Sequence, residues 1–161
     1  MRAALFLSFL ANVALALVSL TILPERVAIH FGQGGEPNGW ALNLVSTFLM
    51  IGFNVLVFCG LYFSPQLIFV LPSKWISLPN RDYWLAPEHR TQTVERFRNR
   101  LWQYGVAVFL FMFGVGLLTI DANLSEPIRL NEHLFLIALV GFFAFTAYWT
   151  VTLVRAFKIP R

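Results

Sequence analysis

The side chains best suited to chemistry in this sequence are two histidines with carboxylates near them. Glu25 and Glu36 flank His30 in one loop, and Glu132 precedes His133 in another. Imidazole and carboxylate groups ligate Zn²⁺, so these residues suggest a metal site if the two loops share a membrane face. Their spacing matches no zinc motif, because the chain has no H-x-x-x-H pair and a single cysteine. We therefore expect hydrogen-bonded structural histidines and no metal or other cofactor, while a pH response through His30 stays open.

A second group of titratable residues lies in the longest loop between apolar stretches, residues 64–100. Asp82, Glu88 and His89 have side chains of the kind used in general acid–base catalysis. Neither a nucleophile paired with a base nor a metal motif accompanies them, so the sequence predicts no catalytic residue and no enzyme. We expect these groups to anchor the loop at a membrane interface and to form salt bridges.

The elements that must position these loops are four apolar stretches of 20 to 23 residues, and none contains Asp, Glu, Lys, Arg or His. A helix of about 20 apolar residues crosses roughly 30 Å of hydrocarbon. The predicted spans are Ala3–Ile22, Ala41–Phe63, Leu101–Ile120 and Leu134–Val154. A composition of 58% hydrophobic and 12% charged residues agrees. The sequence predicts an all-α membrane protein, a four-transmembrane-helix bundle that forms a single integral membrane domain over residues 1–161.

Basic residues are divided unevenly between the loops. Ten of the 12 Lys and Arg residues lie at the N-terminus, in loop 64–100 or after the fourth stretch, whereas Arg26 and Arg129 lie in the other two loops. By the positive-inside rule, we expect the bacterial cytoplasmic (inner) membrane, with both termini and loop 64–100 in the cytoplasm. The net charge of +4 then reflects topology and contact with anionic lipid at the inner face of the bilayer, rather than nucleic-acid binding.

The first stretch also has features of a secretory signal. Arg2 precedes it, and Ala14-Leu15-Ala16 is a triplet of the kind at which signals are cleaved. The triplet lies inside the apolar run, and the run is longer than a usual signal core. We therefore expect the first helix to remain in the protein.

Polarity inside the predicted spans is mild and comes from residues such as Asn12 and Asn54. Such side chains hold transmembrane helices together through hydrogen bonds, which is the expected role here. A substrate path along them is the alternative. Because no ionisable group lies within the spans, the sequence disfavours a proton- or ion-coupled transporter.

Loop 23–40 has the pattern of a compact outer cap on the helix bundle. Hydrophobic residues alternate with more polar ones from Arg26 to Phe31, which predicts a short strand. The glycines that follow and the pair Asn38-Gly39 predict turns. Trp40 is expected at the outer interface as an aromatic anchor, with His30 hydrogen-bonded inside the cap.

Loop 64–100 carries the second dense segment. The pair Pro79-Asn80 predicts a turn, and Tyr83-Trp84-Leu85 predicts an aromatic tip at the inner interface. Pro87 marks the start of a cytoplasmic juxtamembrane helix, whose pattern continues through Arg100 into the third span. Arginines on this helix suit contact with anionic lipid. The loop is longer than two neighbouring helices require, which suggests a platform for a cytoplasmic partner.

Two motifs stand out in these loops. Their residues, which form the candidate functional motif, are His30, Phe31, Gly35, Pro37, Trp40, Pro79, Asn80, Tyr83 and Trp84. Segment 23–40 resembles the signature of a bacterial membrane family of unknown function, numbered 1648, in which it likewise follows a first transmembrane helix. Segment 78–88 resembles a motif in many small members. Gly32 departs from the pattern, because members often have a polar residue there.

The resemblance implies a role in immunity or signal transduction, because the family includes the SdpI-type immunity proteins. In that interpretation the outer cap binds a protein or peptide, and the inner loop passes the signal to a cytoplasmic partner. A structural or accessory subunit of a membrane or envelope complex is the alternative. A small transporter or a membrane enzyme is disfavoured, because the spans are free of charge and catalytic motifs are missing.

Overall fold

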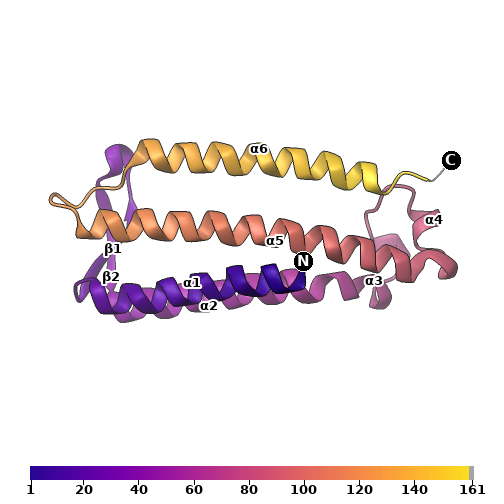
Figure 1. The fold of residues 1–161 in the computed structure, drawn as a ribbon, viewed down its shortest axis with the longest axis horizontal. Helices are drawn as coiled ribbons and strands as arrows, with labels where there is room; N and C mark the ends of the chain where they lie inside the picture. Colours follow the sequence, from indigo (N-terminus) through magenta and orange to yellow (C-terminus); the bar gives the residue numbers. More distant parts are fainter. Residues whose placement is uncertain (160–161) are drawn as a thin grey trace.

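Four long helices lie side by side in the fold (Figure 1). The computed structural model describes residues 1–159. All four helices are long and apolar enough to cross a membrane, which confirms the helical architecture expected from the apolar stretches. A helix makes its backbone hydrogen bonds within itself, so it is the form that an apolar segment of this length adopts in lipid. The long helices are α1 (Arg2–Ile22), α2 (Asn43–Phe63), α5 (Pro87–Leu124) and α6 (Glu132–Ala156).

A two-stranded antiparallel hairpin lies across one end of the bundle, on the left in Figure 1. Strand β1 (Arg26–Phe31) pairs with β2 (Pro37–Leu42), and the short turn η1 (Gln33–Gly35) joins them. Gly34 and Gly35 both have positive φ, a conformation that residues with a Cβ rarely adopt. The turn between the strands therefore depends on glycine.

Short elements fill the opposite end of the bundle, between α2 and α5 in the chain. They are η2 (Ser64–Gln66), α3 (Leu67–Val70), η3 (Ser73–Trp75) and α4 (Arg81–Trp84). Ile68 and Leu85 pack with Val94 of α5 in a small apolar cluster that holds this end together. Pro79 and Asn80 form a turn just before α4, with Asn80 in the left-handed region.

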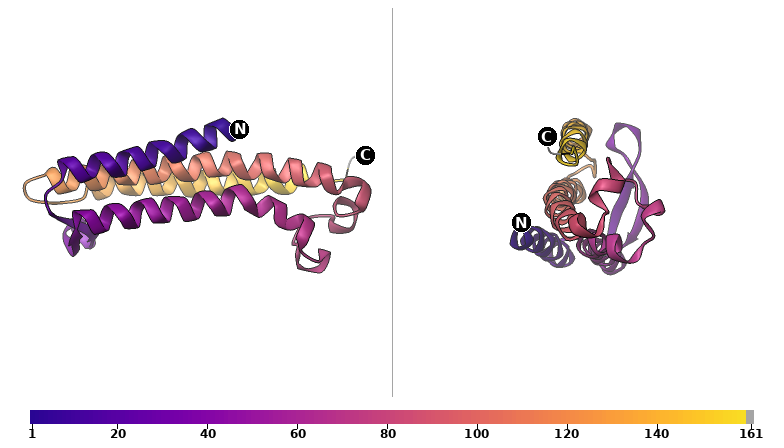
Figure 2. Two further views of the ribbon diagram at one scale, coloured as in Figure 1. Left: turned by 90° about the horizontal axis from the view of Figure 1, so that it is seen from below. Right: turned by 90° about the vertical axis from the view of Figure 1, so that its right-hand side faces the viewer.

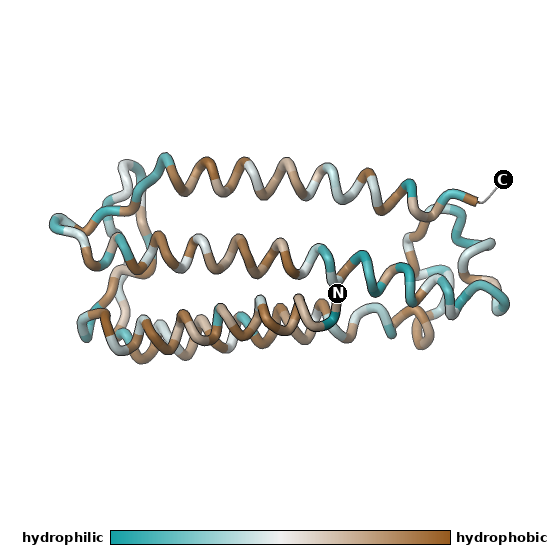
Figure 3. The backbone as a smooth tube through the Cα atoms, viewed as in Figure 1, coloured by the Kyte–Doolittle hydropathy of each residue, from teal (hydrophilic) through white to brown (hydrophobic). Residues whose placement is uncertain are grey.

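The longest helix, α5, is the centre of the bundle. It has 38 residues, which corresponds to about 57 Å. Its first residue, Pro87, suits a helix start because the missing N–H would have no partner there. Helix α1 packs on α5 and on α2, while α6 packs on α5 from another side (Figure 2). Figure 3 shows that the first turns of α5 are hydrophilic and extend beyond the start of α1.

The core lies mainly between α1, α2 and α5. Leu5, Trp102 and Phe109 are buried together, and several partly buried aromatic residues surround them. Tyr62, for example, stacks on Trp102 with ring centroids 5.5 Å apart. By contrast, α6 has no buried residue and touches α5 through exposed or half-buried rings, such as Trp149 on Tyr104. Helix α6 is therefore a peripheral helix.

The charge asymmetry of the sequence is also an asymmetry between the two ends of the molecule. Eleven of the 12 basic residues are among those that the structure describes, since Arg161 lies outside them. Arg26 and Arg129 belong to the hairpin end. The other nine lie at the start of α1, at the end of α6, or in the short elements and first half of α5.

Candidate functional site

Two buried asparagines join elements at the hairpin end of the bundle, one linking β1 to α5 and the other linking α2 to the end of α1. Asn123, in the last turn of α5, accepts a hydrogen bond from the Ala28 N–H at 2.7 Å and donates to the Ala28 carbonyl at 3.0 Å. The amide of Asn123 thus pairs with β1 as a neighbouring strand would. Asn43, at the start of α2, donates to the carbonyls of Leu20 and Leu23 at 3.2 and 3.1 Å. It thereby satisfies carbonyls near the end of α1, where a helix leaves them without intrahelical partners.

The turn of the hairpin is also joined to the connection between α5 and α6. The Leu130 N–H donates to the Gly35 carbonyl at 2.9 Å, and the Arg129 side chain donates to the Gly34 carbonyl. A Cβ added at Gly35 would lie 2.1 Å from the Leu130 carbonyl oxygen. Gly35 is therefore required both for its positive φ and for the close approach of this connection.

The other motif residues of the hairpin lie on or near its surface. His30 Nδ1 hydrogen-bonds to Asn38 Oδ1, but the His30 side chain is exposed instead of enclosed in the cap. Phe31 is paired with Pro37 across the hairpin. Trp40 is 42% exposed, which is compatible with contact to a membrane interface. The first motif thus shapes the hairpin without forming a pocket of its own.

At the opposite end of the bundle, three side chains bind the carbonyls of Ala156, the last residue of α6, and of Phe157, which follows it. Asn80 and Trp84 each donate to the Phe157 carbonyl at 2.8 Å. Arg96, from α5, donates to the Ala156 carbonyl at 2.7 Å and lies over the Trp84 ring, 4.6 Å from its centroid. The final carbonyls of a helix have no intrahelical partner, so these donors complete the helix end. We call Asn80, Trp84 and Arg96 the α6 clamp.

The α6 clamp is itself held by packing and by a further hydrogen bond. Trp84 is only 1% exposed, and its carbonyl accepts a hydrogen bond from the Thr93 hydroxyl at 2.6 Å. Next to it, Tyr83 stacks on His89 with centroids 4.2 Å apart. Trp84 and Leu85, expected at an interfacial tip, are buried within the protein. The second motif therefore contributes packing and helix capping.

Titratable residues are not gathered into a reaction centre in the described part of the chain. Asp82 is exposed and pairs only with its neighbour Arg81, at 3.4 Å. His89 is used in ring stacking. Residues 1–159 include no group of three or more His, Cys, Asp or Glu side chains placed to hold a metal ion.

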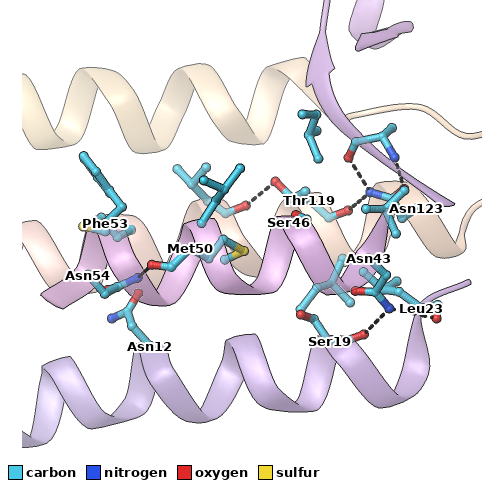
Figure 4. Close-up of a pocket in the computed structure, with 18 of the residues that line it drawn as sticks. Asn12, Ser19, Leu23, Asn43, Ser46, Met50, Phe53, Asn54, Thr119 and Asn123 are labelled. Atoms are coloured by element: carbon cyan, nitrogen blue, oxygen red, sulfur yellow. Dashed lines mark hydrogen bonds between the residues drawn. The ribbon is translucent and has the colours of Figure 1, made fainter. Parts of the chain in front are cut away.

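A groove runs between α2 and α5, from β1 toward the middle of the bundle (Figure 4). Its volume is about 410 Å³, and residues of α1, α2, α5 and β1 line it. Asn12 and Asn54 lie next to each other at its deeper part (Figure 4). Asn12 joins helices as expected, because its Nδ2 donates to the Phe109 carbonyl of α5 at 2.9 Å. Asn54, by contrast, bonds only within α2, to the Met50 carbonyl.

Sequence reasoning identified the motifs but missed several of their partners. Asn43, Asn123 and Arg96 make the decisive contacts, yet none belongs to a recognisable motif. The positions of Asn43 and Asn123 could have indicated their role. Each lies at the edge of an apolar stretch, where the backbone groups of a helix end need hydrogen-bond partners. Arg96 was expected to contact lipid; the structure directs it to the end of α6.

Comparison with known proteins gives one result for the first part of the chain. Residues 7–55 match the family model of a domain of unknown function, DUF1648. This match confirms the resemblance that the sequence motif in segment 23–40 suggested. It covers most of α1, the whole hairpin and the first half of α2, while Asn80 and Trp84 lie outside it. Neither the curated proteins nor the solved structures gave a significant match.

Proposed function

We propose that this chain is a sensor or immunity-like protein of the bacterial inner membrane, with both termini in the cytoplasm. Its hairpin binds a protein or peptide at the outer face, and the region of the α6 clamp passes the signal to a cytoplasmic partner. One observation carries the proposal: the two sequence motifs contact opposite ends of the same segment. Gly35 holds the connection that leads into α6, and Asn80 and Trp84 hold the end of α6.

The packing of α6 supports such a role. Because α6 has no buried residue and joins α5 through surface contacts such as the Trp149 bond to the Arg100 carbonyl, it lies outside the core formed by Leu5, Trp102 and Phe109. We infer that α6 shifts along α5 while this core stays closed. A ligand that favours one position of the hairpin then favours one position of α6, and hence one arrangement of the α6 clamp. A coupling free energy of this kind requires two arrangements that both ends bias.

The orientation follows from charge. The end that carries nine basic residues faces the cytoplasm and its anionic lipid, and the hairpin faces outward. Single-cysteine variants test this in a Cys59→Ala background, since Cys59 is the chain's one cysteine. We expect Glu36→Cys to react with a membrane-impermeant thiol reagent in intact cells. Lys158→Cys should react only after the membrane is opened; equal labelling of both would contradict the orientation.

Coupling between the two ends is tested with a matched pair of arginine variants. Arg129→Ala removes the contact with Gly34 that joins the hairpin to the α5–α6 connection. Arg26→Ala removes the same charge from the same end but leaves that contact in place. Hydrogen exchange at the Phe157 amide reports on the α6 clamp, because this N–H bonds to the Val154 carbonyl. We expect Arg129→Ala, and not Arg26→Ala, to accelerate this exchange several-fold.

Two results would contradict the proposal. If exchange at Phe157 is unchanged in Arg129→Ala, the two ends of α6 are independent, and the motifs have separate structural roles. If both variants change it equally, the effect is one of charge at the hairpin end and does not pass through α6.

A structural or accessory subunit of a membrane complex is the second candidate. Ile137 and Val140 are among several large apolar residues exposed along α6, a surface that either lipid or another protein would cover. In this case α6 would be covered by another protein instead of lipid. Photocrosslinking from position 137 in native membranes distinguishes the two, because a sensor with a lipid-facing α6 gives no discrete protein adduct there.

A further inference from the structure

The groove between α2 and α5 contains a polar atom that the fold leaves without a partner. Asn54 is 2% exposed, and its Oδ1 has no hydrogen-bond donor among the described residues. The amide nitrogen is oriented by its bond to the Met50 carbonyl at 2.8 Å, which uses one of its two N–H groups. The unpaired atom is the amide oxygen, an acceptor, so the contact that it lacks is a hydrogen-bond donor.

The neighbouring asparagine cannot supply that donor. Both N–H groups of Asn12 are engaged, one with the Ser8 carbonyl and one with the Phe109 carbonyl, each at 2.9 Å. The other buried asparagines of the membrane helices use their amides to join elements, as Asn43 and Asn123 do. Asn54 alone among these four forms no link to another element, although the groove opens beside it (Figure 4).

Because Asn54 lies deep in the membrane, leaving its Oδ1 without a hydrogen-bond donor costs free energy. It lies 11 positions after Asn43, the first residue of α2, which places it about 16 Å along the helix axis. That is close to the middle of a hydrocarbon layer of roughly 30 Å. Water is scarce at this depth, and a buried acceptor left unpaired costs about 1–3 kcal/mol. A molecule that brings a donor to this point is therefore favoured over a simple acyl chain.

The walls of the groove define the rest of that molecule. They are formed mainly by apolar side chains, including Leu49, Met50, Phe53, Phe111, Met112 and Val115, and no charged residue lines the groove. A volume of about 410 Å³ lies within the usual range of small-molecule pockets, about 300–1,000 Å³. The groove therefore suits an uncharged chain that enters sideways from the bilayer.

We propose that the groove between α2 and α5 binds an uncharged long-chain lipid alcohol, whose hydroxyl donates a hydrogen bond to Asn54 Oδ1. The chain of the lipid extends along the groove toward Val27 and Ile29 of β1, which line its outer end. Binding would thus occur directly beneath the hairpin. The assignment concerns binding alone and holds whether or not the two ends of α6 are coupled.

The test uses two photoactivatable probes that differ by one donor. Hexadecanol with a diazirine in its chain is compared with its methyl ether, which has the same chain but no hydroxyl. The full chain is placed in phosphatidylcholine nanodiscs, because this lipid has no N–H or O–H group to compete for Asn54. We expect the alcohol to label peptides of α2 and α5 about five- to tenfold more strongly than the ether, as one buried hydrogen bond implies.

Two variants separate the hydrogen bond from the shape of the groove. Asn54→Leu keeps a similar volume and removes the acceptor, so the alcohol and the ether should label it equally. Val115→Phe leaves Asn54 intact and fills the groove, so labelling by both probes should fall together. Leu56→Ala is the control, because Leu56 lies on α2, is 69% exposed and does not line the groove. Thermal unfolding of each variant confirms that it is folded before it is labelled.

Three outcomes would overturn the proposal. Equal labelling of the natural chain by alcohol and ether means that the groove holds any acyl chain. A preference for the alcohol that survives in Asn54→Leu places the hydroxyl elsewhere. Native mass spectrometry of the same nanodiscs covers the third outcome, in which a second copy of the chain shields the groove and excludes the probe.

Discussion

The hairpin end and the clamp end of α6 are held by different kinds of contact. At the hairpin end, the main chain of Leu130 meets the main chain of Gly35, and the fit depends on the absence of a side chain. At the clamp end, side chains of Asn80, Trp84 and Arg96 reach main-chain carbonyls of α6. Besides the Arg129 bond to the Gly34 carbonyl, the hairpin end therefore depends on the close approach of two backbone segments, whereas the clamp end depends on side-chain donors.

This difference predicts opposite sensitivities. Close approach tolerates no added atom, because two backbone segments in contact have little freedom to move apart. A set of three donors on two carbonyls loses one bond at a time, so each substitution removes only part of the contact. One added atom at the hairpin end should thus cause a large loss of stability, whereas each donor removed at the clamp end should cause a smaller loss.

The largest effect is expected for Gly35→Ala. The added Cβ would lie 2.1 Å from the Leu130 carbonyl oxygen, and the φ of 73° is unfavourable for alanine. Overpacking and the left-handed conformation together should cost about 3 kcal/mol or more. Thermal unfolding in detergent measures this loss. Gly141→Ala on α6 is the control, because a Cβ there meets nothing within 4 Å.

A stable Gly35→Ala variant would contradict the account of the hairpin end given above. If its unfolding temperature matches that of Gly141→Ala, the connection between α5 and α6 moves away from the hairpin at little cost. Close approach would then not be the basis of the hairpin end.

A smaller, local effect is expected for Trp84→Phe. The change removes one of two donors to the Phe157 carbonyl and weakens the contact with the Arg96 guanidinium. The loss should be about 2 kcal/mol, with faster hydrogen exchange confined to the end of α6. Trp75→Phe is the matched control, since Trp75 is 67% exposed. Equal effects of the two substitutions would show that the indole N–H of Trp84 and its contact with Arg96 are dispensable.

The four helices were predictable because each depends only on a run of residues without charge. Pro87 as the start of α5 was readable for a similar reason, since proline has a fixed local preference. The short strand suggested by alternation from Arg26 to Phe31 is present as β1. Local rules of this kind need no knowledge of the partner.

The partners themselves were not predictable from the sequence. Asn123 pairs with Ala28 across 95 positions, and Trp84 bonds to Phe157 across 73. Which carbonyl a side chain reaches depends on how the helices pack, and a single chain carries no local signal for that. Asn54 is a further example. Its place within an apolar stretch predicted a hydrogen bond between helices, but the fold leaves its Oδ1 unpaired.

The smallest effect is expected for His30→Ala, although His30 is the residue that first suggested chemistry. Its side chain is exposed and hydrogen-bonds only to Asn38, a neighbour on the facing strand. Losing an exposed contact of this kind should change stability by no more than about 0.5 kcal/mol. Because no group of three metal-binding side chains lies around it within residues 1–159, added Zn²⁺ or a chelator should leave the unfolding temperature of both proteins unchanged. A zinc-dependent increase in the natural chain that His30→Ala abolishes would instead make the hairpin end a metal site, and the contrast with the clamp end would then be one of ligand chemistry.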